Sequence, residues 1–179
     1  GAMITVEITD SNGNVVETLT TTVDAMGNWT VDSLIGLTEG DFTATATATD
    51  AAGNTSPDAS NGFTVDFTGP TLNVENPIDG QLITVRDVNV TGETEAGATV
   101  TVEVTDDQGN VVDTVTTTAD AMGIFSTDVT DLPDGDYTFN VTATDEAGNS
   151  TSEAIGVTID SDDLLLDVTE PADGASTSD

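Results

Sequence analysis

Carboxylates are the only abundant side chains in this sequence that could supply strong chemistry. The 179 residues include 34 Asp and Glu, a single Lys or Arg, no His and no Cys, and the net charge is −33. Without His or Cys, the sequence excludes Ser-His-Asp and Cys-His catalysis, zinc sites of the usual nitrogen and sulfur type, and disulfides. Without basic surface it cannot neutralise phosphates, so we expect no nucleic-acid partner. The chemistry that remains is the binding of cations by oxygen.

Several of these acids stand in a recurrent pattern, in which Asp is followed three residues later by Gly and then by Asn. Asp10 and Asp106 open two such stretches, and Asp145 opens a third. In a turn of this composition the Asp carboxylate accepts backbone N–H groups and Gly takes a positive φ. We interpret Asp10 and Asp106 as turn formers. For Asp145 with Asn149 we favour metal binding, because turn chemistry does not require the additional acid Asp66 in the linker.

A tandem repeat with a period of about 95 residues positions the acids. Ile4–Asp10 matches Val100–Asp106, Asp24–Gly27 matches Asp120–Gly123, and a third copy begins near Leu166. A period of this size fits an independently folding domain rather than a solenoid unit of about 20 to 50 residues. The predicted organisation is a first repeat lacking its opening strands at 1–66, a linker at 67–70, a complete repeat at 71–160, and a linker with the first strand of a third repeat at 161–179.

Within the repeat, apolar residues alternate with Thr or acids, as at Val100, Val102 and Val104. This period of two predicts strands with one solvated face. Turn signals separate the predicted strands, which lie at 72–75, 82–84, 88–91, 99–105, 111–117, 124–129, 137–144 and 155–159. The predicted fold class is all-β, with tandem immunoglobulin-like Greek-key β-sandwiches joined by short linkers. We expect the aromatic residues Trp29, Phe125, Phe42 and Tyr137 to fill the cores.

Alternating strand directions would sort the loops of the complete repeat onto two ends. One end collects Glu93, Glu95, Asp120 and the Asp145–Asn149 loop, and the linker with Asp66 arrives at the same end. Clustered carboxylates repel one another unless a cation lies among them. Ca²⁺ takes six to eight oxygen ligands in flexible geometry and suits such loops better than Mg²⁺ does. The sequence therefore predicts calcium at the junction, while part of the acidic surface also fits adaptation to salt.

The ordered set of motifs resembles the bacterial immunoglobulin-like repeats of giant calcium-dependent adhesins, which include biofilm-associated surface proteins and RTX adhesins. The residues that carry the resemblance are Asp24–Trp29, Thr47–Ser56, Val65–Leu72 and Asn76–Gly80. The resemblance covers nearly the whole chain and is specific to the repeat family rather than to one adhesin.

This resemblance implies a structural extender at the bacterial cell surface. Tandem repeats, rigidified by Ca²⁺ at their junctions and contacting neighbouring repeats of the same array, would project a distal ligand-binding region for adhesion or biofilm formation. The implied ligands are Asp66 and Asp145, with Asp50 as the equivalent of Asp145 in the first copy. Asp160 is the counterpart of Asp66, but Ser161–Leu164 replaces the Thr-Gly-Pro that follows Asp66.

Two other functions fit the sequence less well than the extender does. An exposed aromatic platform, or loops that differ between copies, would favour a carbohydrate- or protein-binding module. The copies instead share their loop motifs. A glycosidase would need an acid in an aromatic, water-poor cleft, so we expect no enzyme. No apolar run approaches the roughly 18 residues of a membrane span, so we expect no direct membrane insertion.

The incomplete first repeat also predicts self-association. It lacks equivalents of the strands at 72–75 and 88–91 and should expose sheet edges. The segment 164–168 is an orphan strand of the complementary kind. It could add to the first repeat of another molecule and give head-to-tail chains.

Overall fold

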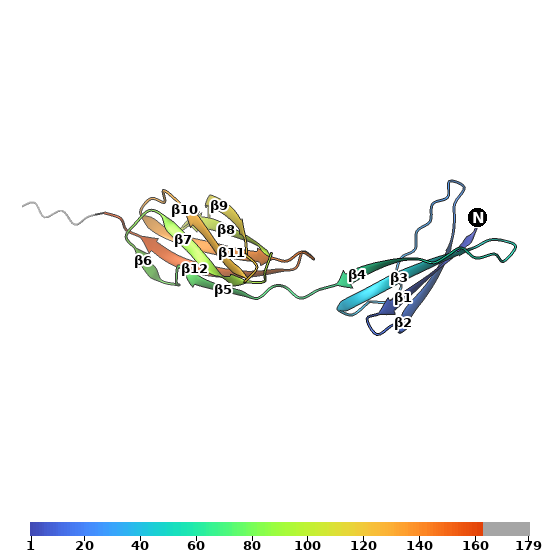
Figure 1. Ribbon diagram of the computed structural model, residues 1–179. Coiled ribbons are helices and arrows are strands. Elements are labelled where there is room, and N and C mark those ends of the chain that lie inside the picture. The colour runs from blue at the N-terminus through green and yellow to red at the C-terminus, as the bar shows by residue number, and fades with distance from the viewer. Residues whose placement is uncertain (163–179) are drawn as a thin grey trace, which may run out of the picture. The chain divides into compact units, whose positions relative to one another are not determined.

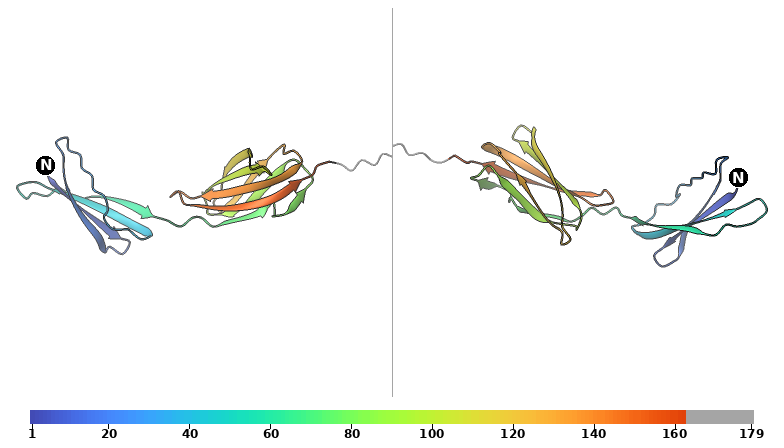
Figure 2. Two further views of the ribbon diagram at one scale, coloured as in Figure 1. Left: turned by 180° about the vertical axis from the view of Figure 1, so that it is seen from behind. Right: turned by 45° about the horizontal axis from the view of Figure 1, so that its top comes forward.

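The computed structural model describes residues 1–162, and every regular element in that range is a β-strand. The chain divides into two compact units, with unit 1 covering Gly1–Thr68 and unit 2 beginning at Gly69. Figure 1 and Figure 2 show strands in two layers in unit 2 and in a single layer in unit 1. The predicted all-β fold class is confirmed. The orphan strand predicted at 164–168 lies outside the described residues.

Unit 2 is built from a three-stranded sheet and a five-stranded sheet, in the orders β10-β7-β5 and β6-β12-β11-β8-β9. The strands are β5 (Leu72–Asn76), β6 (Gln81–Ile83), β7 (Val88–Thr94), β8 (Thr99–Asp106), β9 (Val111–Thr118), β10 (Ile124–Val129), β11 (Gly135–Thr144) and β12 (Ser150–Ile159). All pairings are antiparallel except that of β6 with β12. The chain changes sheet after β5, β6, β7, β9 and β10, and this order is that of the predicted immunoglobulin-like Greek key.

The predicted strands of unit 2 match the structure to within two residues at each end, except that β7 continues to Thr94 beyond the predicted 88–91 and that β12 begins earlier than expected. That strand was expected at 155–159, but it begins at Ser150 because Ser150–Ala154 continue to pair with Asn140–Thr144. Its first half lies exposed or half-buried on both faces. No apolar alternation therefore marked these residues as a strand.

The core of unit 2 lies between the two sheets. Val100, Val102 and Val104 of β8 are fully buried, as are Val90 of β7 and Phe125 of β10. Each such side chain contributes about 1.5–3 kcal/mol when it leaves water. The period-two pattern therefore fixes both the strand and the face that it turns inward.

Tyr137 of β11 ties this core to the preceding loop. Its ring is buried, and its hydroxyl donates a hydrogen bond of 3.0 Å to the Pro133 carbonyl, four residues upstream. This is the tyrosine corner of immunoglobulin-like sandwiches. Burial raises the pKa of the Tyr137 hydroxyl, and the nearby carboxylates of Asp106 and Asp134 raise it further. The prediction that Tyr137 fills the core is confirmed, as it is for Phe125 and Phe42.

Unit 1 contains a single four-stranded sheet in the order β2-β1-β3-β4. Its strands are β1 (Met3–Asp10), β2 (Val15–Thr22), β3 (Gly40–Thr49) and β4 (Ala59–Val65). These match β8, β9, β11 and β12 of unit 2 by sequence. A small core of Ile4, Val6, Ile8, Leu19 and Phe42 packs against the irregular segment around Val31 and Leu37.

One expectation for unit 1 is wrong, and a second is incomplete. Trp29 does not fill a core, because its side chain is 44% exposed. The missing opening strands also expose more than sheet edges. Their counterparts in unit 2, β5 and β7, belong to the second sheet, so unit 1 lacks the layer that would cover the inner face of its own sheet.

Candidate functional site

The Asp-containing turns of both units share one local geometry. At Asp106, one carboxylate oxygen accepts the backbone N–H groups of Gln108 and Asn110 at 3.0 and 2.8 Å. The Asn110 side-chain amide donates to the other carboxylate oxygen at 2.9 Å, and Gly109 has a φ of 80°. Asp10 makes the same bonds in unit 1. The interpretation of Asp10 and Asp106 as turn formers is confirmed.

The predicted calcium ligands Asp50, Asp120 and Asp145 stand in turns of this same kind. Asp145 accepts the backbone N–H of Asn149 at 2.8 Å and its side-chain amide at 3.0 Å. Asp50 accepts the equivalent bonds, and Asp120 accepts two backbone N–H groups at a single oxygen, Oδ1. Turn chemistry therefore accounts for the local position of Asp145 as well as it does for Asp106. A calcium-binding role of Asp145 stays a prediction.

Hydrogen bonding favours the ionised form of the carboxylates of Asp10, Asp50, Asp106 and Asp145. The side-chain and backbone donors of the Asn four residues along lower the pKa of Asp10, Asp50 and Asp106 below the ordinary value. At Asp145, desolvation is the largest single influence and raises the pKa, but the bonds from Asn149 and the turn backbone together lower it. These side chains are hard anionic oxygen donors, which is the ligand type that calcium prefers.

The strand register of unit 2 brings most of its predicted ligands to one end, which we call the leading end and which comprises residues 69–71, 95–98, 119–123 and 145–149. Thr99 pairs with both Thr144 and Thr118, so the turns that follow β9 and β11 lie beside the start of β8. The Thr94 N–H donates to the Gly123 carbonyl at 2.8 Å, which joins the loop carrying Glu95 to the turn carrying Asp120. The grouping predicted from alternating strand directions is confirmed within unit 2.

Proximity of loops does not by itself complete a metal shell. Among residues 1–162, no three acidic side chains gather closely enough to hold an ion together. Glu93 lies on β7, and it pairs across the ladders with Ile124 and Asn73 rather than with another acid. The donor chemistry of the leading end fits calcium. A complete shell would also need backbone or amide oxygens, or ligands from another repeat.

Asp66 and Asp160 follow the last strands of the two units. Asp66 accepts the Thr68 N–H at 3.0 Å, and the Asp160 N–H donates to the Ile83 carbonyl at 2.9 Å. The two residues are therefore placed at the start of each linker, as their sequence positions predicted. Their role as calcium ligands stays a prediction.

One acidic residue in each unit, which was not predicted from the sequence, anchors the start of the linker that follows the unit. Glu39 accepts the Phe67 N–H at 2.9 Å and the Thr68 hydroxyl at 2.6 Å. Its counterpart Asp134 accepts the N–H and the hydroxyl of Ser161 at 3.1 and 2.6 Å. These hydroxyl bonds are the largest influence that lowers the pKa of each carboxyl. The signal was present, since an acid precedes Gly-Asp-aromatic in both copies.

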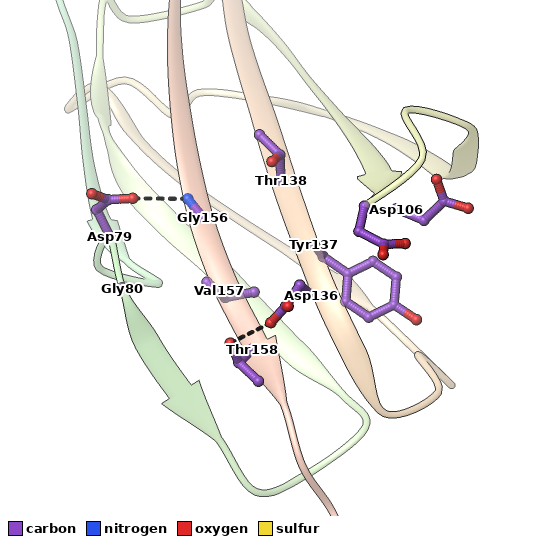
Figure 3. Close-up of a pocket in the computed structure, with 10 residues that line it drawn as sticks. Asp79, Gly80, Asp106, Asp136, Tyr137, Thr138, Gly156, Val157 and Thr158 are labelled. Carbon is purple, nitrogen blue, oxygen red and sulfur yellow. Dashed lines mark hydrogen bonds between the residues drawn. The ribbon is translucent and has the colours of Figure 1, made fainter.

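The other end of unit 2 carries an open cavity of about 330 Å³ lined by four Asp residues, Asp79, Asp106, Asp107 and Asp136. Figure 3 shows Asp79 directed at the Gly156 N–H and Asp136 at the Thr158 hydroxyl, with distances of 2.9 and 2.6 Å. The hollow is anionic, but these two acids have protein donors there and Asp106 is held in its turn. The hydrogen bonds of Asp79, Asp106 and Asp136 therefore serve the fold itself.

The repeat pattern matches a known family over most of the chain. A family described as bacterial Ig-like domain matches residues 1–67 and 78–161. Among curated proteins there is no match. Within the part of the chain that the structure describes, no helix has the length and hydropathy needed to cross a membrane.

Several solved structures are similar to this chain. A tetra-tandem repeat in the extending region of a large adhesion protein shares 35% identity over 89% of this chain, with a TM-score of 0.47. This chain spans only 42% of that one. CopC from Methylosinus trichosporium OB3b shares 16% identity over 54% of this chain and 100% of its own, with a TM-score of 0.44. The fibronectin(III)-like modules of Clostridium thermocellum CbhA share 14% identity over 87% of this chain and 77% of theirs, with a TM-score of 0.43.

Proposed function

The chain belongs to the bacterial Ig-like domain family, and from that premise we propose that it is a structural extender of a bacterial surface adhesin. Its repeats hold a distal ligand-binding region away from the cell, and they act through length and stiffness rather than through catalysis. The similar tandem repeat comes from the extending region of a large adhesion protein, which agrees with this role.

The observation that carries the proposal is the anchoring of the linker residues to folded structure. Phe67 and Thr68 are bonded to Glu39 of unit 1. On the side of unit 2, Pro70 is buried, and a Cβ on Gly69 would lie 2.9 Å from the Thr151 hydroxyl oxygen. Phe67 and Thr68 are thus bonded within unit 1 and Gly69 and Pro70 lie close against unit 2, whereas a flexible tether would be rich in unbound Gly and Ser. The second anchor, at Asp134 and Ser161, shows that the device is repeated.

Calcium is the second part of the proposal. We assign Asp66, at the start of the linker, and Asp145 with Asn149, at the leading end of unit 2, as ligands supplied by consecutive repeats. Glu95 and Asp120 at the same end, and Glu93 near the end of β7, are further candidates. Asp50 and Asp160 would serve the junctions before and after. Binding restricted to the folded, ordered junction would stabilise that form by mass action.

The test is thermal unfolding and small-angle scattering of the full chain, with Ca²⁺ and with EDTA. We expect chelation to lower the melting temperature by several degrees, because an ion at 100 times its Kd contributes about 2.7 kcal/mol. We also expect the maximum dimension to shorten. Identical melting and scattering with and without EDTA would overturn the calcium assignment.

Two matched substitutions localise the ion. Asp145→Asn should abolish the calcium-dependent part of the melting temperature. Asp106→Asn changes a carboxylate with the same turn hydrogen bonds at the other end of unit 2, and it should leave the calcium-dependent part intact. Equal loss in both variants would show that calcium acts on the total charge rather than on this site.

Self-association is a separate part of the proposal. The segment 164–168 adds as a strand to unit 1 of a second molecule and forms head-to-tail chains at high concentration. Sedimentation of the full chain and of a chain ending at Asp162 tests this. A monomer at all concentrations for the full chain would contradict it.

A further inference from the structure

The only Lys or Arg among the 179 residues is Arg86, in a chain that carries 34 acids. It lies in the loop between β6 and β7, and its side chain is exposed. Its Nε–H donates a hydrogen bond of 3.1 Å to the hydroxyl of Ser161, the second residue after β12. The single basic side chain of the protein therefore contacts the start of the segment that leaves unit 2.

Ser161 links the Arg86 guanidinium to a carboxylate. Arginine has only donors, so the Ser161 oxygen accepts the bond from Nε and directs its own proton to the Asp134 Oδ1, 2.6 Å away. The Ser161 backbone N–H donates to the same carboxylate oxygen at 3.1 Å. In such a chain of guanidinium, hydroxyl and carboxylate, each hydrogen bond polarises the next. We call Arg86, Asp134 and Ser161 the exit anchor.

The backbone around Arg86 is itself tied to the loop that follows β10. The Arg86 carbonyl accepts the Leu132 N–H at 3.0 Å, and the Asp87 carboxylate accepts the Asp131 N–H at 3.0 Å. The guanidinium is thus presented to Ser161 from a fixed loop. The joined segments 84–87, 130–134 and 160–162 carry this one positive charge and five acids, Asp87, Asp131, Asp134, Asp160 and Asp162.

The charge of Arg86 acts on more than one partner at the exit anchor. An isolated charge pair on a surface contributes little, because water and side-chain entropy offset the attraction. Here the guanidinium also offsets repulsion among carboxylates of three segments that must stay together. The bonds from Ser161 are the largest influence that lowers the pKa of Asp134, and the charge of Arg86 lowers it further. Without Arg86, the anchor would contain acids alone.

We propose that Arg86 is a built-in counter-ion that fixes the segment leaving unit 2 through the Ser161 hydroxyl and Asp134, in the place that a free cation would otherwise take at this anchor. The inference deepens the extender role and rests on it for its purpose, because a stiff array needs a fixed linker start. Its test reads the anchor directly and in EDTA, so the anchor and the calcium-dependent stiffening can fail independently.

Amide hydrogen exchange of the full chain in EDTA and at low salt tests the proposal. In Arg86→Gln, the Ser161 N–H should exchange about two- to fivefold faster, the range expected when an exposed charge pair is lost. Loss of a positive charge slows the base-catalysed exchange reaction itself, so faster exchange can come only from opening of the anchor. Unchanged or slower exchange at Ser161 would overturn the proposal.

The Leu132 N–H shows whether the variant keeps its loop. It bonds to the Arg86 backbone carbonyl rather than to the guanidinium, so its exchange should be the same in Arg86→Gln and in the parent. Faster exchange at both Leu132 and Ser161 would show that Arg86 is needed to fold the loop, and the anchor role would be overturned.

The response to salt separates a counter-ion from a neutral hydrogen-bond donor. The Debye length falls from about 30 to about 3 Å between about 0.01 and 1 M NaCl. In Arg86→Gln only repulsion remains, so salt should slow Ser161 exchange toward the rate of the parent. In the parent, salt screens attraction and repulsion together and should have a smaller effect. An equal response in both proteins would overturn the counter-ion role.

Two matched variants test whether the charge must stand at this position. Arg86→Lys keeps the charge but lacks the planar guanidinium, so it should retain the salt response of the parent and lose part of the protection at Ser161. Thr116→Asp, on the exposed side of β9, lowers the net charge by one as Arg86→Gln does, and it should leave Ser161 exchange unchanged. A salt response of Arg86→Lys like that of Arg86→Gln would overturn the proposal, as would equal effects of Thr116→Asp and Arg86→Gln.

A double-mutant cycle tests the bridging hydroxyl. In a Ser161→Ala background, Arg86→Gln should change amide exchange at position 161 less than it does in the parent, because the oxygen that joins the two charged groups is gone. The same change in both backgrounds would show that the charge acts without the hydroxyl, and it would overturn the route through Ser161.

Discussion

The two units are copies of one repeat that differ in a single layer. Unit 2 has both sheets and buries Val102, Val141 and Phe125 almost completely, whereas unit 1 has one sheet and leaves Trp29 44% exposed. The Asp turns, in contrast, have the same bonds in both units. Turns in this repeat are therefore specified locally, while the strand state of β10 is specified by the neighbouring β7. Sequence similarity alone does not carry a strand from one copy to the other.

Truncating the two equivalent aromatic residues should give the largest contrast between the units. Phe125→Ala should cost unit 2 about 3–5 kcal/mol, because a fully packed ring is replaced by a cavity. Trp29→Ala should cost unit 1 less than half of that, because much of the ring is already in water. Native-state amide exchange of β8 and β1 measures each unit separately. Equal costs would show that Trp29 lies in a closed core.

Removing the tyrosine corner should have a smaller effect and make unit 2 resemble unit 1, where Phe42 stands at the same position. Tyr137→Phe deletes the bond to the Pro133 carbonyl and should cost about 1 kcal/mol. The loss should appear in denaturant unfolding of unit 2 and not in the exchange of unit 1. Unchanged unfolding of unit 2 would mean that water replaces the hydroxyl without cost.

Acid should affect the Asp turns of both units by similar, small amounts. The pKa of Asp10 and of Asp106 is lower in the folded chain, so each carboxylate stabilises the fold above its unfolded pKa of about 3.9. That stability is lost as the pH falls through the folded pKa. Relief of repulsion among the other acids changes stability as well, so Asp10→Asn and Asp106→Asn are compared with the parent at each pH. A difference confined to one unit would contradict local specification.

The sequence was sufficient to predict most of unit 2. Most of its strands alternate apolar and polar residues, and the structure reproduces the Asp-x-x-Gly turns that follow β8, β9 and β11. The start of β12 was missed because Ser150–Ala154 bury neither face. The exposure of Trp29 was missed because the pattern around it is that of β10, and the lacking strands were expected to expose sheet edges rather than the inner face of the sheet.

The candidate site was less predictable than the fold. Asp106 and Asp145 stand in the same motif, so spacing could not separate a turn former from a ligand, and the structure gives both the same bonds. Alternating strand directions correctly grouped the turns of Asp120 and Asp145 at the leading end. The anchoring acids Glu39 and Asp134 were missed because their partners, Thr68 and Ser161, differ between the copies.

The parallel pairing of β6 with β12 determines how unit 2 responds to a pulling force. The first and last strands of its larger sheet run in the same direction, with Val157, Thr158 and Ile159 opposite Gln81, Leu82 and Ile83. A force that draws the two ends of the unit apart therefore slides these strands along each other. Their hydrogen bonds are loaded together in shear and must rupture nearly at once, instead of opening one by one like a zipper. In unit 1, β4 pairs only with β3 among the described residues, so unit 1 has no parallel strand pair that would be loaded in shear in this way.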